Sequence, residues 1–174
     1  MHIDAFEKRY AIIASLMVGL MLLVIIASFT LLNIYPPSNP GERIDSTRLH
    51  LSEEFAESNL GVTTAPDGSV TVRLVMAKYL VHPQEITVPA GTPITFRIAT
   101  PDVVHGLNVP GTNINTMVVP GYVSQVRTQV QMKQVAKIGA PNPDGSVSLP
   151  LFCNEYCGYG HQSMWARITV TPVI

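Results

Sequence analysis

The sequence predicts an all-β domain, a Greek-key sandwich, that follows one N-terminal transmembrane helix. Three observations support this: a long run without charged residues near the N-terminus, apolar residues that alternate with polar ones from Ser69 onward, and turn-forming residues between the alternating runs. A period of two is typical of half-buried strands, and about seven short strands separated by regular turns favour a sandwich or barrel.

The N-terminal run, Ala11 to Ile34, contains no charged residue. A helix of about 24 residues spans roughly 36 Å, which is enough to cross a hydrocarbon core of about 30 Å with some tilt. A cleaved signal peptide is the alternative, but its apolar core is only about 7 to 15 residues long. We therefore expect residues 1–35 to form a polar cap and a retained helix in the lipid bilayer.

Charges at the two ends of this run predict its orientation. Lys8 and Arg9 precede it, whereas Glu42 and Arg43 balance each other beyond it. The positive-inside rule then places the N-terminus in the cytoplasm and the β domain on the periplasmic or outer face of the plasma membrane, as a single-pass protein. The formal net charge of −1 says nothing about partners. The sequence has no basic cluster, so we expect no nucleic-acid partner.

Residues 36–65 are predicted to form a linker and a short helical segment. Three prolines and a glycine in the stretch from Tyr35 to Gly41 cannot continue the helix. A weak helical pattern follows from Asp45 to Asn59 and is expected to lie against the β domain. The apolar positions of this pattern are Leu49, Leu51 and Phe55.

The β domain is expected to span residues 66–174. In three strands the alternation identifies the side chains that face the core: Val70, Val72, Leu74 and Met76; Ile94, Phe96 and Ile98; and Val126, Thr128, Val130 and Met132. Further strands are expected over residues 85–88, 147–152 and 166–171. Turn signals such as Pro-Asp-Gly lie between the strands.

Residues 153–164, Cys-Asn-Glu-Tyr-Cys-Gly-Tyr-Gly-His-Gln-Ser-Met, concentrate four potential soft-metal ligands. Thiolate, imidazole and thioether donors favour copper, and a Cys-His-Met set is typical of electron-transfer copper sites. A single copper ion needs only one thiolate. The second cysteine is therefore the residue that distinguishes a site for two copper ions from a site for one. Two thiolates on one loop can bridge two copper ions, each terminated by its own histidine.

Two other interpretations of the cysteine pair stay open at this point. Cys153 and Cys157 can form a disulfide in an oxidising compartment. A disulfide, however, does not need His161 and Met164 at their spacings from the cysteines. A zinc site is the other possibility, but it uses four Cys or His ligands and no thioether. Met164 considered alone is more often a core residue.

The pattern Cys-x-Glu-x-Cys-Gly-x-Gly-His-x2-Met at residues 153–164 resembles the CuA motif of subunit II of cytochrome c oxidases. The run Pro-Asp-Val-Val-His-Gly at residues 101–106, followed by Gly-Thr-Asn-Ile-Asn at 111–115, is similar to the segment that carries the first histidine of that family. The chain most resembles the single-helix subunit II of ba3-type (B-family) haem-copper oxidases, and the resemblance covers nearly the whole chain.

The resemblance implies a cupredoxin-like fold and a binuclear copper (CuA) centre in which the cysteines bridge the metals and each histidine terminates one. The implied ligands are His105, Cys153, Glu155 through its backbone carbonyl, Cys157, His161 and Met164. His82 is the rival for the upstream histidine, but no matching motif surrounds it. The second ring nitrogen of His105 needs a hydrogen-bond partner, for which Asp102 and Asn113 are the candidates.

The implied function is electron acceptance in a proton-translocating terminal oxidase. Cytochrome c would reduce the copper pair, and the electron would pass to haem in subunit I, where oxygen becomes water. The oxidase can also contain a further small subunit. The chain would not catalyse the oxygen step alone. One alternative is a CuA subunit of a haem-copper nitric oxide reductase. The other is a membrane-anchored copper carrier outside any oxidase, but blue-copper carriers have one cysteine in this loop, whereas this chain has two.

Two glutamates carry further expectations from the resemblance. Glu7 matches a glutamate at the mouth of a proton-uptake channel shared with subunit I, although a charge at a helix start also interacts favourably with the macrodipole. Glu155 stands where the ba3-type pattern has glutamine. A glutamate there resembles the larger A-type oxidases, in which its side chain binds magnesium or manganese at the contact with subunit I.

The docking site for the electron donor departs from the A-type pattern. A-type subunits have an aromatic-rich strand there, whereas the stretch at residues 76–82 has one aromatic residue. A smaller apolar patch of Tyr79, Leu80 and Val81 is expected instead. Trp165, beside the copper motif, is the alternative, although a lone tryptophan at a strand start is usually a core residue.

Overall fold

The computed structural model describes residues 4–31 and 41–172, which belong to two compact units, Met1–Pro40 and Gly41–Ile174. The predicted boundary at residue 35 and the proline-rich linker up to Pro40 lie outside the described residues. The division of the chain at residues 35 and 65 stays a prediction.

The first unit contains helix α1 (Ala5–Thr30), which Asp4 caps by accepting a hydrogen bond from the Phe6 amide at 3.1 Å. The span Ala5–Ser28 has a mean hydropathy of 2.7, so it is long and apolar enough to cross a membrane. The predicted long apolar helix is confirmed, but it begins before Ala11 because the polar residues ahead of the apolar run form a capped first turn. The end expected at Ile34 lies outside the described residues.

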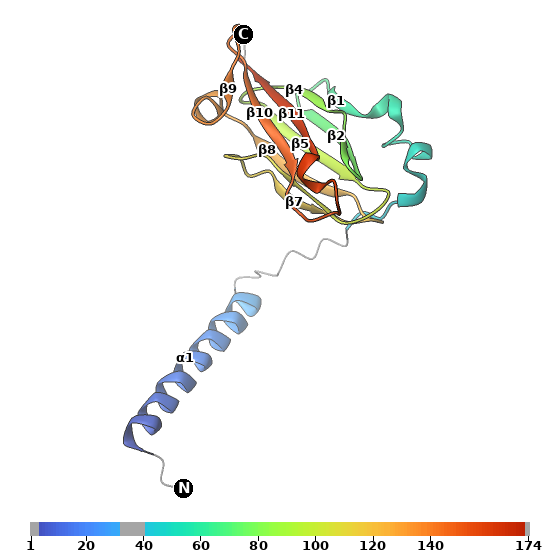
Figure 1. Cartoon of the computed structure of the whole chain (residues 1–174). Helices are drawn as coiled ribbons and strands as arrows, with labels where there is room; N and C mark the ends of the chain where they lie inside the picture. The colour runs from blue at the N-terminus through green and yellow to red at the C-terminus, as the bar shows by residue number, and fades with distance from the viewer. Residues whose placement is uncertain (1–3, 32–40, 173–174) are drawn as a thin grey trace. The chain divides into compact units, whose positions relative to one another are not determined.

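The second unit is a two-layer β sandwich (Figure 1). One sheet has the strand order β1-β2-β5-β8, and β3 pairs with the end of β2. Its strands are β1 (Gly61–Thr64), β2 (Val70–Ala77), β3 (Leu80–His82), β5 (Pro93–Ala99) and β8 (Ser124–Gln129). β2 and β5 run parallel, and the other pairs of this sheet are antiparallel.

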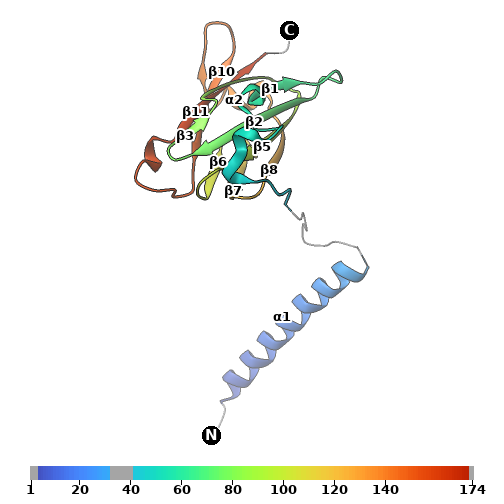
Figure 2. The ribbon, with the colours of Figure 1, turned by 90° about the vertical axis from the view of Figure 1, so that its right-hand side faces the viewer.

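The other sheet has the strand order β4-β11-β10-β6-β7, with β9 beside β10. Its strands are β4 (Glu85–Pro89), β6 (His105–Asn108), β7 (Asn115–Val118), β9 (Ala140–Pro141), β10 (Val147–Cys153) and β11 (Trp165–Thr171). β10 and β11 are antiparallel neighbours. The red segment that joins them projects from one end of the sandwich (Figure 2).

The strand predictions agree with the structure in most places. Every apolar residue of the predicted patterns in β2 and β5 is buried, and β4, β10 and β11 confirm the three further strands. The third pattern was predicted too long. β8 ends at Gln129 and Met132 begins a short helix, α2 (Met132–Val135), because the chain turns there and buries Val135 in the core.

The segment expected as a weak helix forms only two 3-10 turns, η1 (Ser46–Leu51) and η2 (Glu57–Asn59). One residue inside η1 has non-helical backbone angles, so no continuous helix forms. Leu49 and Phe55 are nevertheless buried against the sandwich, whereas Leu51 is exposed. The segment therefore lies against the domain through two of the three residues expected to do so.

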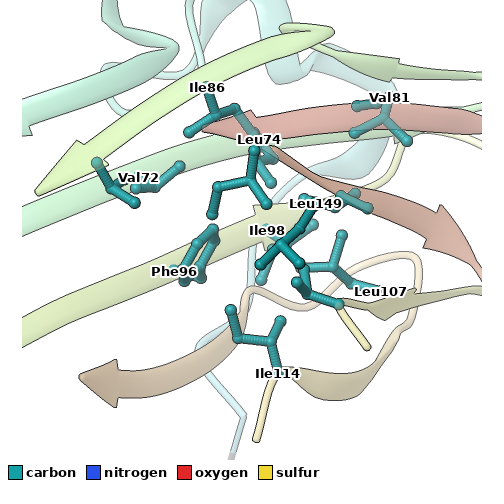
Figure 3. Close-up of a cluster of buried hydrophobic side chains, with 14 of the residues drawn as sticks. Val72, Leu74, Val81, Ile86, Phe96, Ile98, Leu107, Ile114 and Leu149 are labelled. Carbon is teal, nitrogen blue, oxygen red and sulfur yellow. The ribbon is translucent and has the colours of Figure 1, made fainter. Parts of the chain in front are cut away.

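The core lies between the two sheets and is filled by apolar side chains from both (Figure 3). Figure 3 shows Phe96 and Ile98 of β5 facing Leu107 and Leu149 of the other sheet, and all four side chains are buried. Burying one such side chain is worth about 1.5–3 kcal/mol. This core holds rigidly the strand ends that carry the predicted metal ligands.

Arg97 of β5 ties the segment before β1 to the sheet through charged contacts. Its guanidinium donates to Oε2 of Glu54 at 2.7 Å and to Oε2 of Glu42 at 2.7 Å. Burial alone would raise the pKa of Glu54, but the hydrogen bond and charge of Arg97, with a contribution from Arg73, outweigh it and lower the pKa.

The substitution Glu54→Gln is expected to lower the free energy of unfolding by about 1–2 kcal/mol at neutral pH. A carboxylate with a lowered pKa stabilises the fold above its ordinary value of 4.5 and loses that contribution as the pH falls through the lowered value. Urea unfolding followed by the fluorescence of Trp165 should therefore show a difference in unfolding free energy between the two proteins at about pH 7 that shrinks as the pH falls below 4.5. A difference of the same size in acid would contradict this explanation.

Candidate metal centre

Two strand ends bring the predicted ligands together. β10 ends at Cys153 and β11 begins at Trp165, so residues 154–164 connect neighbouring strands. β10 also pairs with β6, whose first residue is His105, in the register Cys153↔Leu107. This pairing places a histidine from a distant part of the sequence beside the cysteine loop.

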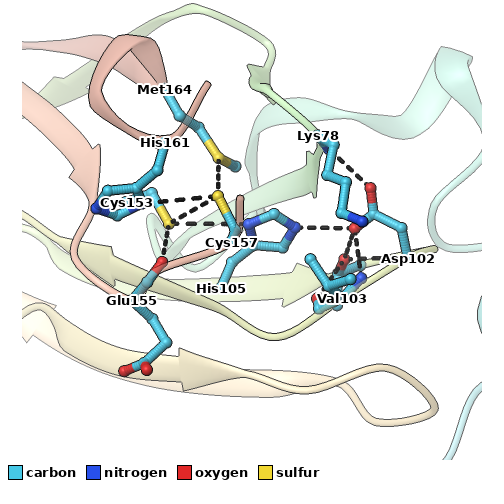
Figure 4. Close-up of polar contacts among 10 residues, drawn as sticks. Lys78, Asp102, Val103, His105, Cys153, Glu155, Cys157, His161 and Met164 are labelled. Carbon is cyan, nitrogen blue, oxygen red and sulfur yellow. Dashed lines mark hydrogen bonds and ion pairs between the residues drawn. The ribbon is translucent and has the colours of Figure 1, made fainter. Parts of the chain in front are cut away.

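Two thiols form the middle of the site, and each has its own imidazole (Figure 4). The Sγ atoms of Cys153 and Cys157 lie 4.0 Å apart. Sγ of Cys153 lies 3.8 Å from Nδ1 of His105, and Sγ of Cys157 lies 3.6 Å from Nδ1 of His161. The ligand atoms of His105, Cys153 and Cys157 all lie within 4.8 Å of one another.

Two weaker donors complete the set. The backbone oxygen of Glu155 lies 3.1 Å from Sγ of Cys153, and Sδ of Met164 lies 3.7 Å from Sγ of Cys157. Met164 and both cysteines are buried, which shields the sulfurs from water. The carboxylate of Glu155 points away from them (Figure 4). Thiol, imidazole and thioether donors gathered in this way suit copper.

The geometry argues against the two other interpretations of the cysteine pair. A disulfide bond is about 2.05 Å long, whereas these sulfurs are 4.0 Å apart and both cysteines are free. A structural zinc site uses four Cys or His ligands, and the thioether of Met164 beside the thiols is not part of such a set.

The second ring nitrogen of His105 has the partner that a metal-binding imidazole requires. Nε2 lies 2.8 Å from Oδ1 of Asp102. Because a carboxylate only accepts hydrogen bonds, Nε2 carries the proton and Nδ1 keeps its lone pair for a metal. Asn113 bonds instead to the Arg127 carbonyl and to Thr128. Of the two candidates, Asp102 is therefore the partner.

Burial and hydrogen bonding shift the pKa values of Asp102 and Cys157 in opposite directions. Burial alone would raise the pKa of Asp102, but the hydrogen bonds that it accepts from His105 and three neighbours lower it. Burial, together with the neighbouring Cys153, raises the pKa of Cys157 to about 11. A metal ion that binds here at neutral pH therefore has to displace a proton from the Cys157 thiol.

Comparison with known proteins decides the family. Residues 68–171 match the family described as cytochrome c oxidase subunit II, periplasmic domain. This chain belongs to that family. It is similar to cytochrome c oxidase subunit 2 of Thermus thermophilus, with 35% identity over 134 residues that cover 77% of this chain and 90% of the relative. A second subunit 2 from a strain of the same species also has 35% identity over 134 residues, covering 77% of this chain and 72% of that one.

A solved chain shares the fold of this subunit II. It belongs to a haem-copper terminal oxidase dimer and has a TM-score of 0.54 and 21% identity, covering 94% of this chain and 98% of that chain. The predicted β sandwich with a long N-terminal apolar helix is confirmed. The prediction that the chain is a subunit of a cytochrome c oxidase is also confirmed.

The docking patch predicted in this subunit II is only partly at the surface. Tyr79 and Leu80 are 38% and 43% exposed, but Val81 is fully buried. The prediction for Val81 is wrong because β3 pairs with β2, and strand alternation turns this side chain into the core. Docking of the electron donor at Tyr79 and Leu80 stays a prediction.

The structure also describes two other residues singled out in the sequence of this subunit II, one in each compact unit. His82, the rival ligand, has its Nε2 2.8 Å from Oε1 of Glu57. Glu7 lies exposed in the first turn of α1. Its role in proton uptake stays a prediction.

Two exposed aromatic side chains of the loop at residues 154–164 of this subunit II were not predicted from the sequence. Tyr156 and Tyr159 are 77% and 91% exposed, and Trp165, at the start of β11, is 52% exposed rather than a core residue. The signal that would have found the tyrosines is their position inside the motif. Both stand among the Cys, Gly and His residues of the motif, at positions where neither ligation nor a tight turn requires an aromatic ring.

Proposed function

We propose that this subunit II accepts electrons from cytochrome c at a binuclear copper (CuA) centre and passes them to haem in subunit I, where oxygen is reduced to water. The observation that carries this proposal is the pair of thiols 4.0 Å apart, each with its own imidazole nitrogen within 3.8 Å. One copper ion needs a single thiolate, so a second thiolate with its own imidazole supports a site for two metals.

The residues of the chain hold the metals in place. The proposed ligands are Cys153, Cys157, His105, His161, Met164 and the backbone carbonyl of Glu155. When bound, the copper pair supplies a one-electron centre whose charge is shared between two metals. His105 and Cys153 lie at strand ends fixed by the core, and the other ligands lie on the loop that joins two neighbouring strands, so their positions are set before metal binds. Burial of the sulfurs excludes water, so little solvent has to reorganise when an electron is transferred.

We also propose that α1 anchors the subunit in the plasma membrane, with the N-terminus in the cytoplasm and the copper domain on the periplasmic or outer face. Lys8 and Arg9 at the start of the helix support this orientation. Small residues such as Ala14 and Gly19 suit packing against helices of subunit I or of a further small subunit. Protease added outside spheroplasts should therefore release a copper-binding fragment, and a fully protected domain would contradict the orientation.

Glu155 is proposed to bind magnesium or manganese through its side chain at the contact with subunit I, because its carboxylate points away from the sulfurs (Figure 4). Glu155→Gln should leave the copper absorption unchanged, since the backbone carbonyl remains. The affinity of the complex for manganese should fall by about 10-fold or more. Manganese electron resonance measures that affinity, and loss of the copper absorption would contradict a backbone-only role toward copper.

Analysis of the purified complex tests the proposed function. We expect haem in a co-purifying subunit I, a pair of copper ions on this subunit, and oxygen consumption driven by cytochrome c. Consumption of nitric oxide in place of oxygen would overturn the proposed reaction in favour of a haem-copper nitric oxide reductase. Copper binding without any haem-containing partner would instead indicate an anchored copper carrier.

A further inference from the structure

The turn between β2 and β3, formed by Lys78 and Tyr79, touches both segments that carry the proposed copper ligands. β2 ends at Ala77 and β3 begins at Leu80, so these two residues alone make the turn. The flanking strands pair with each other, and Val81 is fully buried. The turn is therefore held firmly at its base.

The first contact runs through Asp102 to His105. The main-chain amide of Lys78 donates to Oδ2 of Asp102 at 2.7 Å, and Oδ1 accepts from Nε2 of His105 at 2.8 Å. Oδ1 also accepts from the Val103 amide at 2.6 Å, which fixes the orientation of the carboxylate. The turn, the carboxylate and the imidazole form one hydrogen-bonded chain (Figure 4).

The second contact is the Tyr79 ring against the loop between Cys157 and His161. A Cβ atom on Gly158 would lie 2.6 Å from the Tyr79 hydroxyl oxygen, and one on Gly160 would lie 2.5 Å from Cγ of the ring. Both separations are below 3.0 Å, which real Cβ atoms essentially never show. The ring therefore packs on bare backbone, and glycine at both positions leaves the space that it fills.

We infer that the Lys78–Tyr79 turn is a clamp that positions both ligand-bearing segments, with Asp102 and Tyr79 as its two positioning residues. Asp102 orients His105 from the side of β6, and Tyr79 holds the loop that carries the other ligands. This inference rests on the proposed copper function. A site held in this way from two sides keeps its ligands in place in both oxidation states and releases its metal slowly.

The two positioning residues of the clamp, Asp102 and Tyr79, act by different physical effects, so they can be tested separately. The carboxylate of Asp102 makes His105 a stronger donor and stabilises the more oxidised metal. Its replacement by asparagine should therefore raise the reduction potential of the centre. The Tyr79 ring carries no charge and acts by packing alone, so its loss should free the loop without the same effect on the potential.

Copper extraction from the full-length chain in detergent tests the clamp. The copper-loaded protein is mixed with excess ethylenediaminetetraacetate, and the loss of copper absorption is timed. Asp102→Asn and Tyr79→Ala should each lose copper about 10 to 100 times faster than the unaltered chain. Tyr79→Phe keeps the ring and should stay close to the unaltered rate. A redox titration should show a raised potential in Asp102→Asn.

Tyr122→Ala is the matched control. Tyr122 has the same exposed fraction as Tyr79, 38%, and its ring also lies over a glycine, Gly41, where a Cβ would be 2.8 Å from Cδ1. This variant should lose copper at the unaltered rate. Trp165 fluorescence checks that each variant is folded, and Asp102→Asn, which preserves side-chain size, tests the clamp even where Tyr79→Ala does not fold.

Equal extraction rates in Asp102→Asn, Tyr79→Ala and the control would overturn the clamp. A rate for Tyr79→Phe as fast as for Tyr79→Ala would also overturn it, because the packing ring is retained. The proposed function fails separately. If the unaltered chain shows the electron resonance of a single copper nucleus, the binuclear site is wrong, while the same extraction rates still decide whether the turn positions the ligands.

Discussion

Cys153→Ser is expected to abolish the electron resonance pattern of two copper nuclei and to lower oxygen consumption driven by cytochrome c by at least about 100-fold. Serine offers a hard oxygen donor that does not replace a thiolate toward copper. Cys157 keeps its neighbours, Nδ1 of His161 at 3.6 Å and Sδ of Met164 at 3.7 Å. One thiolate, one imidazole and one thioether are the donors of a single copper ion, so the variant should show the pattern of one nucleus.

Electron resonance and an oxygen electrode, applied to the purified complex, measure this prediction. Gln162→Ala provides the control because Gln162 is exposed on the same loop and its side chain is not among the proposed ligands. It should retain both the two-nucleus pattern and the activity. A Cys153→Ser complex that still shares an electron between two copper nuclei would remove the second cysteine from the mechanism.

Phe96→Ala is expected to lower the free energy of unfolding by about 3–5 kcal/mol. The Phe96 side chain is 0% exposed and lies in the middle of the sandwich, so its removal leaves a cavity between the sheets (Figure 3). Domains of this kind are stable by about 5–15 kcal/mol, so the loss is a large part of the total. Urea unfolding of the copper-free chain in detergent, followed by Trp165 fluorescence, measures it.

Leu51→Ala is the control for the core substitution. Leu51 is 69% exposed, and truncation there should change the free energy of unfolding by less than about 0.5 kcal/mol. A loss below about 1 kcal/mol for Phe96→Ala would show that the two sheets do not pack closely around this ring. The ligand-bearing strand ends would then lack the rigid support that the proposed site needs.

The parts of the structure that local chemistry controls could be predicted from the sequence. Alternation identified the buried faces of β2 and β5, because each strand side chain points to the face opposite to that of its neighbour. Spacing within residues 153–164 identified the soft donors, because a short loop between paired strands keeps them close together. The expected exposure of Val81 failed because the pairing partner of its strand decided which face this side chain occupies.

The sequence by itself determined the membrane-length apolar helix, the all-β character of the remainder and the identity of the soft donors, since these depend on residue type and on contacts a few positions apart. Only the tertiary structure decided that β6 lies beside β10, that Asp102 rather than Asn113 bonds to His105, and that Tyr79 packs on the loop at residues 154–164. The strand pairing joins residues far apart in the sequence and fixes where the His105 segment lies. The Tyr79 contact also joins residues far apart in the sequence. The free energy that selects such contacts comes from packing the two sheets as a whole, which no short stretch of sequence encodes.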